Sequence, residues 1–100
     1  MLNITKTVED GKTTFALDGR LDTVTSPDLD NAIQEEKDNL TDLTFDVEKL
    51  EYISSAGLRV FLAAQKIINK QEGTMKVINV NDTIMEIFEV TGFSEILTIE

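Results

Sequence analysis

The sequence contains no cysteine and no histidine among its 100 residues. The absence of cysteine excludes disulfides, thiolate metal sites and thiol nucleophiles, and it suits a reducing compartment such as the cytoplasm. Without either residue the chain also lacks Ser-His and Cys-His nucleophilic machinery, the common zinc and iron ligand sets and the usual proton shuttle near neutral pH. We therefore do not expect ordinary hydrolytic catalysis, and we expect neither a metal nor a cofactor.

Basic residues are scarce: nine Lys and Arg stand against 19 Asp and Glu, so the net charge is −10. Such a charge repels the phosphate backbone of nucleic acids and anionic membrane surfaces. A long apolar run is missing too, since nowhere do about eighteen uncharged apolar residues follow one another, as a membrane-crossing helix needs. We expect a cytoplasmic protein with neither nucleic acid nor membrane as a partner.

What remains is a globular composition, with 41% hydrophobic and 28% charged residues. A chain of this length can bury one modest core but not two. We therefore expect residues 1–100 to form a single domain.

Periodicity predicts the elements of that domain. Apolar and polar residues alternate through 2–8 and 13–17, with the turn pair Asp10-Gly11 between them, which indicates a β-hairpin. A helix is predicted from about Pro27 to Asn39, with Ser26 as its N-cap. The other predicted elements are a strand at 43–47, a helix at 57–70, a strand at 75–80, a helix from Asn81 or Asp82 to Gly92, and a strand at 96–99.

This order places helices between the later strands, which implies parallel crossovers. The strand at 43–47 alternates between apolar and polar residues, as in a sheet whose two faces differ. We therefore predict a small α/β domain of order ββαβαβαβ: a mixed, mostly parallel sheet with an N-terminal hairpin and helices mainly on one face. The helix at 57–70 is apolar on most sides, so we expect it to be the most buried.

One segment, Tyr52–Val60, gathers small residues where a parallel strand passes into that buried helix. Sites of α/β proteins lie at the carboxyl ends of such strands. Unpaired amide groups at the start of a helix carry partial positive charge and favour an anion. A serine here is either the N-cap of the helix or an exposed hydroxyl that can receive a phosphoryl group, and residue type alone favours the cap.

The run Ser54-Ser55-Ala56-Gly57-Leu58-Arg59-Val60 resembles the signature loop of the STAS domain family, to which the bacterial anti-sigma factor antagonists belong. Gly19-Arg20-Leu21-Asp22 is similar to the Gly-x-Leu-Asp element that follows the second strand of that family. Val90-Thr91-Gly92-Phe93 resembles the segment that closes its third helix. The likeness extends over the whole chain.

The resemblance implies that Ser55 is the phosphoacceptor, because it matches the serine of the family pattern Asp-Ser-x-Gly-Leu-Gly. Two positions depart from this pattern: Ser54 stands where the family commonly has aspartate, and Arg59 where it has a second glycine. Ser54 is the second-ranked acceptor. The residues expected to surround the phosphosite and to meet a partner are Asp22, Tyr52, Ser54, Ala56, Gly57, Leu58 and Arg59.

The resemblance also implies a regulatory cycle. The unphosphorylated form would bind a serine-kinase anti-sigma factor, and phosphorylation at Ser55 would release it, thereby controlling transcription that depends on a sigma factor. The kinase would supply ATP and magnesium, and a phosphatase would reset the cycle.

Two other functions stay open. A STAS-type scaffold could bind another partner or a small ligand without phosphorylation, and the departures at Ser54 and Arg59 motivate this alternative. An enzyme could use paired carboxylates such as Glu35-Glu36, but adjacent residues of a helix point in different directions, which favours plain exposed charge. Nucleotide binding lacks both the glycines of a dinucleotide loop and a Gly-Lys-Ser/Thr motif.

Overall fold

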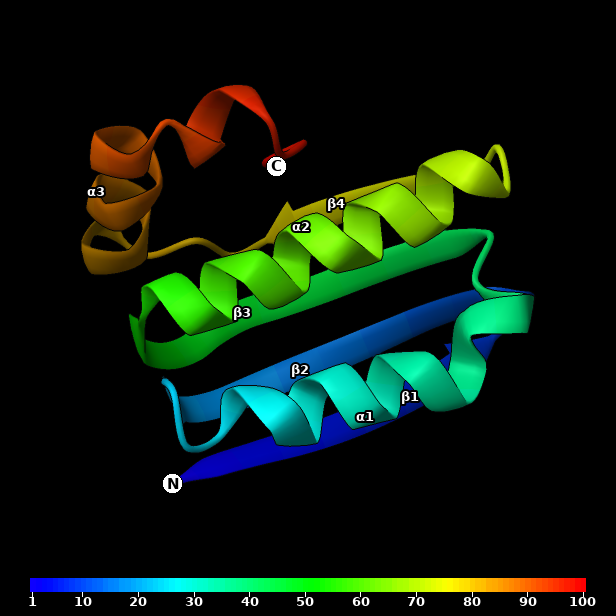
Figure 1. Ribbon diagram of the computed structural model, residues 1–100, viewed down its shortest axis with the longest axis horizontal. Coiled ribbons are helices and arrows are strands. Elements are labelled where there is room, and N and C mark those ends of the chain that lie inside the picture. Colours follow the sequence, from blue (N-terminus) through cyan, green and yellow to red (C-terminus); the bar gives the residue numbers. More distant parts are fainter.

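The computed structural model describes residues 1–100, and it arranges four strands and three α-helices around one sheet (Figure 1). In chain order the elements are β1 (Leu2–Glu9), β2 (Lys12–Leu21), α1 (Ser26–Glu36), β3 (Asp42–Ile53), α2 (Ser55–Lys70), β4 (Thr74–Ile78) and α3 (Asp82–Thr91). Short 3-10 helices, Lys37–Asn39 and Phe93–Glu95, follow α1 and α3. The sheet order is β1-β2-β3-β4, with β1 antiparallel to β2 and the other neighbours parallel. The predicted mixed α/β fold is confirmed.

The β1–β2 hairpin closes through Asp10 and Gly11, as its turn residues predict. Both residues have positive φ angles, 52° at Asp10 and 79° at Gly11. This is the geometry of a two-residue type I′ turn, whose twist matches that of the strands. The register that follows pairs Glu9 with Lys12 and ends with Leu2 opposite Gly19.

Helix α1 begins at Ser26, so this residue is not the N-cap that its type predicts. Thr25 occupies the N-cap position, and its side chain makes no capping hydrogen bond. Its hydroxyl is engaged elsewhere: it donates to the carbonyl oxygen of Arg20 at 2.8 Å and accepts the N–H of Asp22 at 2.9 Å. The turn between β2 and α1 thus uses the side chain that would otherwise cap the helix.

The predicted strand at 96–99 is reduced to a single parallel bridge between Val77 of β4 and Ile99. Val77 donates its N–H to Thr98 at 2.8 Å and accepts the N–H of Glu100 at 2.9 Å. The 3-10 helix at 93–95 takes up the residues that follow α3, which leaves only the end of the chain to pair with β4. Gly92 ends α3 in the left-handed conformation, with φ at 82°, as predicted.

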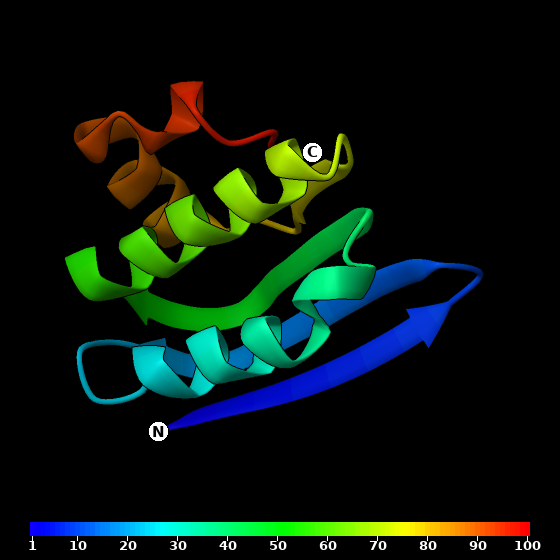
Figure 2. The ribbon, with the colours of Figure 1, turned by 45° about the vertical axis from the view of Figure 1, so that its right-hand side comes forward.

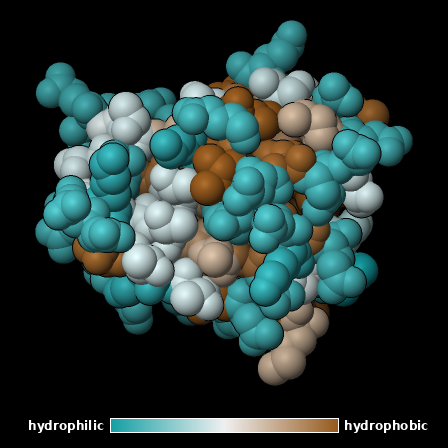
Figure 3. All heavy atoms as spheres, turned by 180° about the vertical axis from the view of Figure 1, so that it is seen from behind, coloured by the Kyte–Doolittle hydropathy of each residue, from teal (hydrophilic) through white to brown (hydrophobic).

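Helices α1 and α2 lie side by side across one face of the sheet, and α3 packs against the later part of β3, beyond the end of β4 (Figures 1 and 2). The core fills the space between sheet and helices: Phe15 of β2, Phe45 of β3, Phe61 of α2 and Phe88 of α3 are each 0% exposed. No helix covers the opposite face, where hydrophilic side chains spread over much of the surface (Figure 3). None of the helices is long and apolar enough to cross a membrane.

Candidate functional site

The candidate site lies where β3 passes into α2, at the same edge of the sheet as the turn from β2 into α1. Because β2 and β3 are parallel neighbours, their carboxyl ends meet, with Leu21 opposite Ile53. The backbone also joins the two connections directly, since the Ser54 N–H donates to the carbonyl oxygen of Leu21 at 2.9 Å. The topology therefore brings Asp22 and Ser55 to one edge of the molecule.

The two serines of the loop have different positions and partners. Ser54 is the N-cap of α2: its backbone is extended, with φ −93° and ψ 174°, and its Oγ accepts the N–H of Gly57 at 3.4 Å. Ser55 is the first residue of α2; it is exposed, and its hydroxyl makes no hydrogen bond within the protein. The two roles foreseen for a serine at this place thus fall on different residues, the cap on Ser54 and a free hydroxyl on Ser55.

The Asp22 carboxylate is bound into its own turn. Its Oδ1 accepts the N–H groups of Val24 and Thr25, each at 3.0 Å. The Thr25 backbone N–H is the main reason that the pKa of Asp22 lies below its ordinary value, because this bond is made to the charged form. A carboxylate fixed in this way is a negative charge beside the site and not a free base for the Ser55 hydroxyl.

Arg20 and Tyr52 form a cross-strand pair at the ends of β2 and β3. The guanidinium carbon lies 4.6 Å from the centre of the Tyr52 ring, within range of a cation–π interaction. The Arg20 Nε also lies 4.0 Å from a carboxylate oxygen of Asp22. The sequence did not indicate this contact, because it depends on a register shift between β2 and β3 just before Arg20.

Three of the residues predicted around the phosphosite face inward. Gly57 and Leu58 are buried, and Ala56 is half-buried. Leu58 is only 4% exposed and belongs to the core that underlies the loop. Gly57 and Leu58 thus pack beneath the loop and offer little surface to a partner, whereas Ala56 stays partly accessible.

The exposed surface at this edge comes from other side chains. Tyr52 is 36% exposed, and Arg59 lies exposed one helical turn after Ser55. Val24, which the sequence did not single out, is 83% exposed in the turn between β2 and α1. Its apolar type within a polar turn was the signal that could have indicated it. A free hydroxyl, an aromatic ring, an aliphatic side chain and a guanidinium thus lie exposed at this edge of the sheet.

Gly57 is a packing requirement of the loop. A Cβ at this position would lie 2.7 Å from Cγ of Leu21 and 2.9 Å from Cγ1 of Ile53, both of them core atoms. Replacing glycine by alanine in a helix gains up to about 1 kcal/mol, whereas overpacking a core costs about 1–3 kcal/mol. The close approach of α2 to the ends of β2 and β3 therefore depends on a residue without a side chain.

We expect Gly57→Ala to lower the free energy of unfolding by about 1–2 kcal/mol, because the overpacking exceeds the gain in helix propensity. Urea denaturation measures this change. Combining Gly57→Ala with Leu21→Ala removes the clashing atoms, so the double variant should be more stable than the sum of the single effects predicts. Strictly additive effects would contradict this explanation of the glycine.

No three Asp or Glu side chains gather where they could hold a metal ion. Of the adjacent pair considered above, Glu36 forms an ion pair with Lys6 of β1 at 2.5 Å, whereas Glu35 is exposed. Both carboxylates raise the pKa of Lys6, Glu36 chiefly through its hydrogen bond and Glu35 through its charge, as surface charges do.

Comparison with known proteins places the chain within one family. The model of the STAS domain matches residues 3–100. The chain is 29% identical over 97 residues to the anti-sigma-B factor antagonist of Staphylococcus aureus. This match covers 96% of this chain and 90% of the relative.

Solved structures share the fold at lower identity. An anti-sigma factor antagonist from Mycobacterium paratuberculosis superposes with a TM-score of 0.86 at 22% identity, covering 99% of this chain and 85% of that one. The Bacillus cell fate determinant SpoIIAA in its phosphorylated form superposes with a TM-score of 0.76 at 17% identity, covering 100% of this chain and 91% of that one. The arrangement of strands and helices described above is therefore that of these proteins.

Proposed function

The chain belongs to the STAS domain family, and on this premise we propose that it is an anti-sigma factor antagonist controlled by phosphorylation of Ser55. In the unphosphorylated form it binds a kinase-type anti-sigma factor and so leaves a sigma factor free for transcription. The kinase transfers a phosphoryl group from ATP, with magnesium, to the Ser55 Oγ, which loses its proton; ADP leaves, and the complex dissociates. A phosphatase restores the hydroxyl. The protein acts in the cytoplasm as a substrate and not as a catalyst.

The observation that carries this proposal is that the two serines of the loop have different structural roles. Ser54 is used as the cap of α2, whereas the Ser55 hydroxyl is exposed and without a partner in the protein. A kinase can therefore reach Ser55 without breaking a bond of the fold. The name of the Staphylococcus aureus relative supports the general role of the protein.

The mechanism follows from what a phosphate adds at this place. It brings about −1.5 to −2 charges and three acceptor oxygens, and the free amide groups at the start of α2 tolerate them. The fold beneath stays unchanged, because Gly57 and Leu58 keep their packing against the core. What changes is the exposed surface that the partner covers.

We expect the cognate kinase and ATP to add one phosphoryl group to the wild-type protein and none to Ser55→Ala, as intact mass measures. Ser54→Ala should still be phosphorylated. It should also lose about 0.5–1 kcal/mol of stability, since it removes an N-cap whose hydrogen bond is long. Equal phosphorylation of wild type and Ser55→Ala would refute the assignment of the acceptor.

A second candidate function is a STAS scaffold that binds its partner regardless of phosphorylation. The observation that favours it is Arg59, an exposed cation where the family pattern has glycine. A scaffold predicts that Ser55→Asp binds the partner as tightly as wild type, whereas the switch predicts weaker binding. Titration of both proteins into the same partner separates the two.

A further inference from the structure

Helix α2 has a charge opposite to that of the rest of the protein. It carries three basic side chains, Arg59, Lys66 and Lys70, and no acidic one, in a chain of net charge −10. None of the three takes part in an ion pair, since the ion pairs of the protein involve Lys6 and Arg20. Their charge is therefore available to another molecule.

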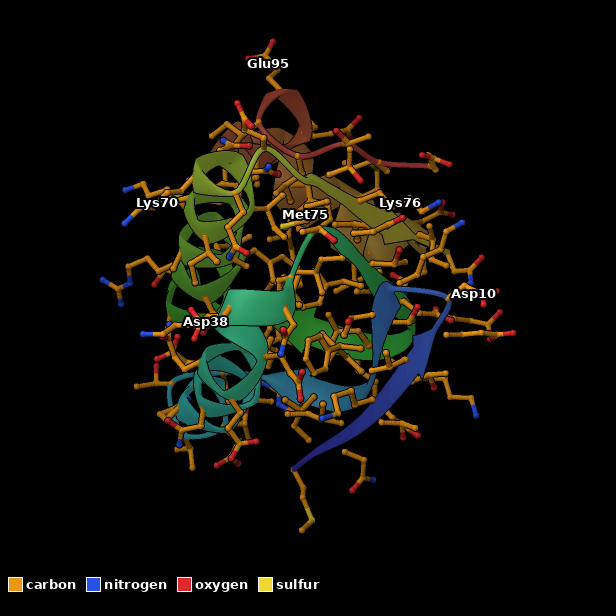
Figure 4. The ribbon with its side chains drawn as sticks, turned by 90° about the vertical axis from the view of Figure 1, so that its right-hand side faces the viewer. Asp10, Asp38, Lys70, Met75, Lys76 and Glu95 are labelled. Carbon is orange, nitrogen blue, oxygen red and sulfur yellow. The ribbon has the colours of Figure 1, made fainter.

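The three cations lie on one face of the helix. Arg59 and Lys66 are seven residues apart and Lys70 follows four residues later, a spacing that repeats on one side of an α-helix. All three are exposed, whereas Phe61, Ala64 and Ile68 fill the opposite, buried side. Figure 4 shows Lys70 pointing away from the body of the protein on the helical side, with Lys76 on the opposite side.

Ser55 belongs to the same face. It lies four residues before Arg59, and side chains four residues apart on a helix are neighbours, with Cβ atoms about 5–6 Å apart. Long helical side chains also lean toward the N-terminus, which directs Arg59 toward the turn that carries Ser55. We call Ser55, Arg59, Lys66 and Lys70 together the α2 cationic face.

Helix α1, which packs beside α2, carries four acidic side chains, but none of them forms an ion pair with a cation of α2. At its far end Lys70 lines a shallow hollow between α1 and α2 together with Lys37 and Asp38, so one further cation and one acid lie there. The other arginine of the chain, Arg20, is held by Tyr52 and Asp22 at the ends of β2 and β3. Arg59 is thus the unpaired guanidinium beside the candidate phosphosite.

We propose that the α2 cationic face is the docking surface for an acidic surface of the anti-sigma factor, an inference that rests on the function proposed above. The proposal rests on charge complementarity: the net charge of −10 repels an acidic partner, whereas α2 is the α-helix that carries basic and no acidic side chains. The same geometry gives phosphorylation a second effect. A phosphate on Ser55 pairs with Arg59 one turn away and withdraws this guanidinium from the partner.

The experiment compares two charge-reversal variants with the same net charge. Lys66→Glu with Lys70→Glu alters the cationic face but not the Ser55 loop, whereas Lys12→Glu with Lys76→Glu alters lysines outside α2. In the unphosphorylated protein, we expect the first variant to weaken binding to the anti-sigma factor by at least about tenfold and to reduce the salt dependence of this binding. The second variant should change the affinity by no more than about threefold. Titration calorimetry at several salt concentrations measures both.

The outcomes separate this inference from the proposed function. If wild type binds the anti-sigma factor and both variants bind equally well, the docking surface is wrong and the function stands. If binding depends on Lys66 and Lys70 but the kinase does not modify Ser55, the docking surface stands and the phosphorylation switch is wrong. If wild type does not bind the anti-sigma factor, both are overturned. Binding of wild type to duplex DNA or anionic vesicles that the first variant loses would also overturn the inference, since the face would then serve a polyanion.

Discussion

Phosphorylation of Ser55 is expected to raise the dissociation constant of the complex with the anti-sigma factor by more than about a hundredfold, which corresponds to about 3 kcal/mol. An interface formed around an exposed hydroxyl would have to bury a group with about −1.5 to −2 charges. Burying a charge that is not fully paired costs about 2–5 kcal/mol in an interface, and the pairing of the phosphate with Arg59 offsets only part of this cost. The fixed Asp22 carboxylate at the same edge adds repulsion, because its turn prevents it from moving away.

Titration calorimetry with the unmodified and the phosphorylated protein measures this change. Ser55→Asp and Ser55→Asn form a matched pair of similar size that differs in charge. The aspartate variant should weaken binding more than the asparagine variant does. A phosphorylated protein that binds within about threefold of the unmodified one would contradict a release driven by charge.

The parts of the fold that the sequence predicts well are those with a local physical cause. The hairpin follows from the positive φ angles that Asp10 and Gly11 adopt easily, and the end of α3 follows from Gly92. The buried side of α2 follows from its apolar periodicity. In each case a few neighbouring residues determine the conformation, so no distant contact has to be known.

The parts that the sequence misses depend on hydrogen bonds of turns, which residue type does not reveal. Ser26 is a good N-cap by type, yet Thr25 takes that position because its hydroxyl binds the end of β2. The C-terminal strand shrinks to one bridge because Ile96 and Leu97 donate their N–H groups back to the carbonyl oxygen of Phe93. Neither outcome follows from residue type, because each depends on a hydrogen bond made within a turn.

In the candidate site, too, some features could be predicted from the sequence and others only from the structure. The segment 54–60 and its serine were found from residue types and a family resemblance. The choice between Ser54 and Ser55 as the cap is geometric, because it depends on which residue has the extended backbone before α2. The contact of Arg20 with Tyr52 and the exposure of Val24 depend on strand register and turn geometry, so they emerge only from the structure.

Phe61→Ala is expected to lower the free energy of unfolding by about 3–5 kcal/mol, because it removes a large side chain that is fully buried. Phe61 links the helices to the sheet: its ring centre lies 4.6 Å from that of Phe45 in β3 and 6.3 Å from that of Phe88 in α3. Domains of this size are stable by about 5–15 kcal/mol, so the variant stands close to unfolding. Urea denaturation measures the loss as a lower urea concentration at the midpoint of unfolding, provided that the dependence of the unfolding free energy on urea keeps the wild-type slope.

The matched control is Phe61→Leu, which keeps most of the volume and should cost no more than about 1.5 kcal/mol. The comparison bears on function because Phe61 is on the buried side of the helix whose exposed side begins at Ser55. If packing at Phe61 only anchors α2, Phe61→Leu should be phosphorylated at the wild-type rate under conditions where it is folded. A loss of less than about 1 kcal/mol in Phe61→Ala would show that the row of rings from β3 to α3 does not hold α2 against the sheet.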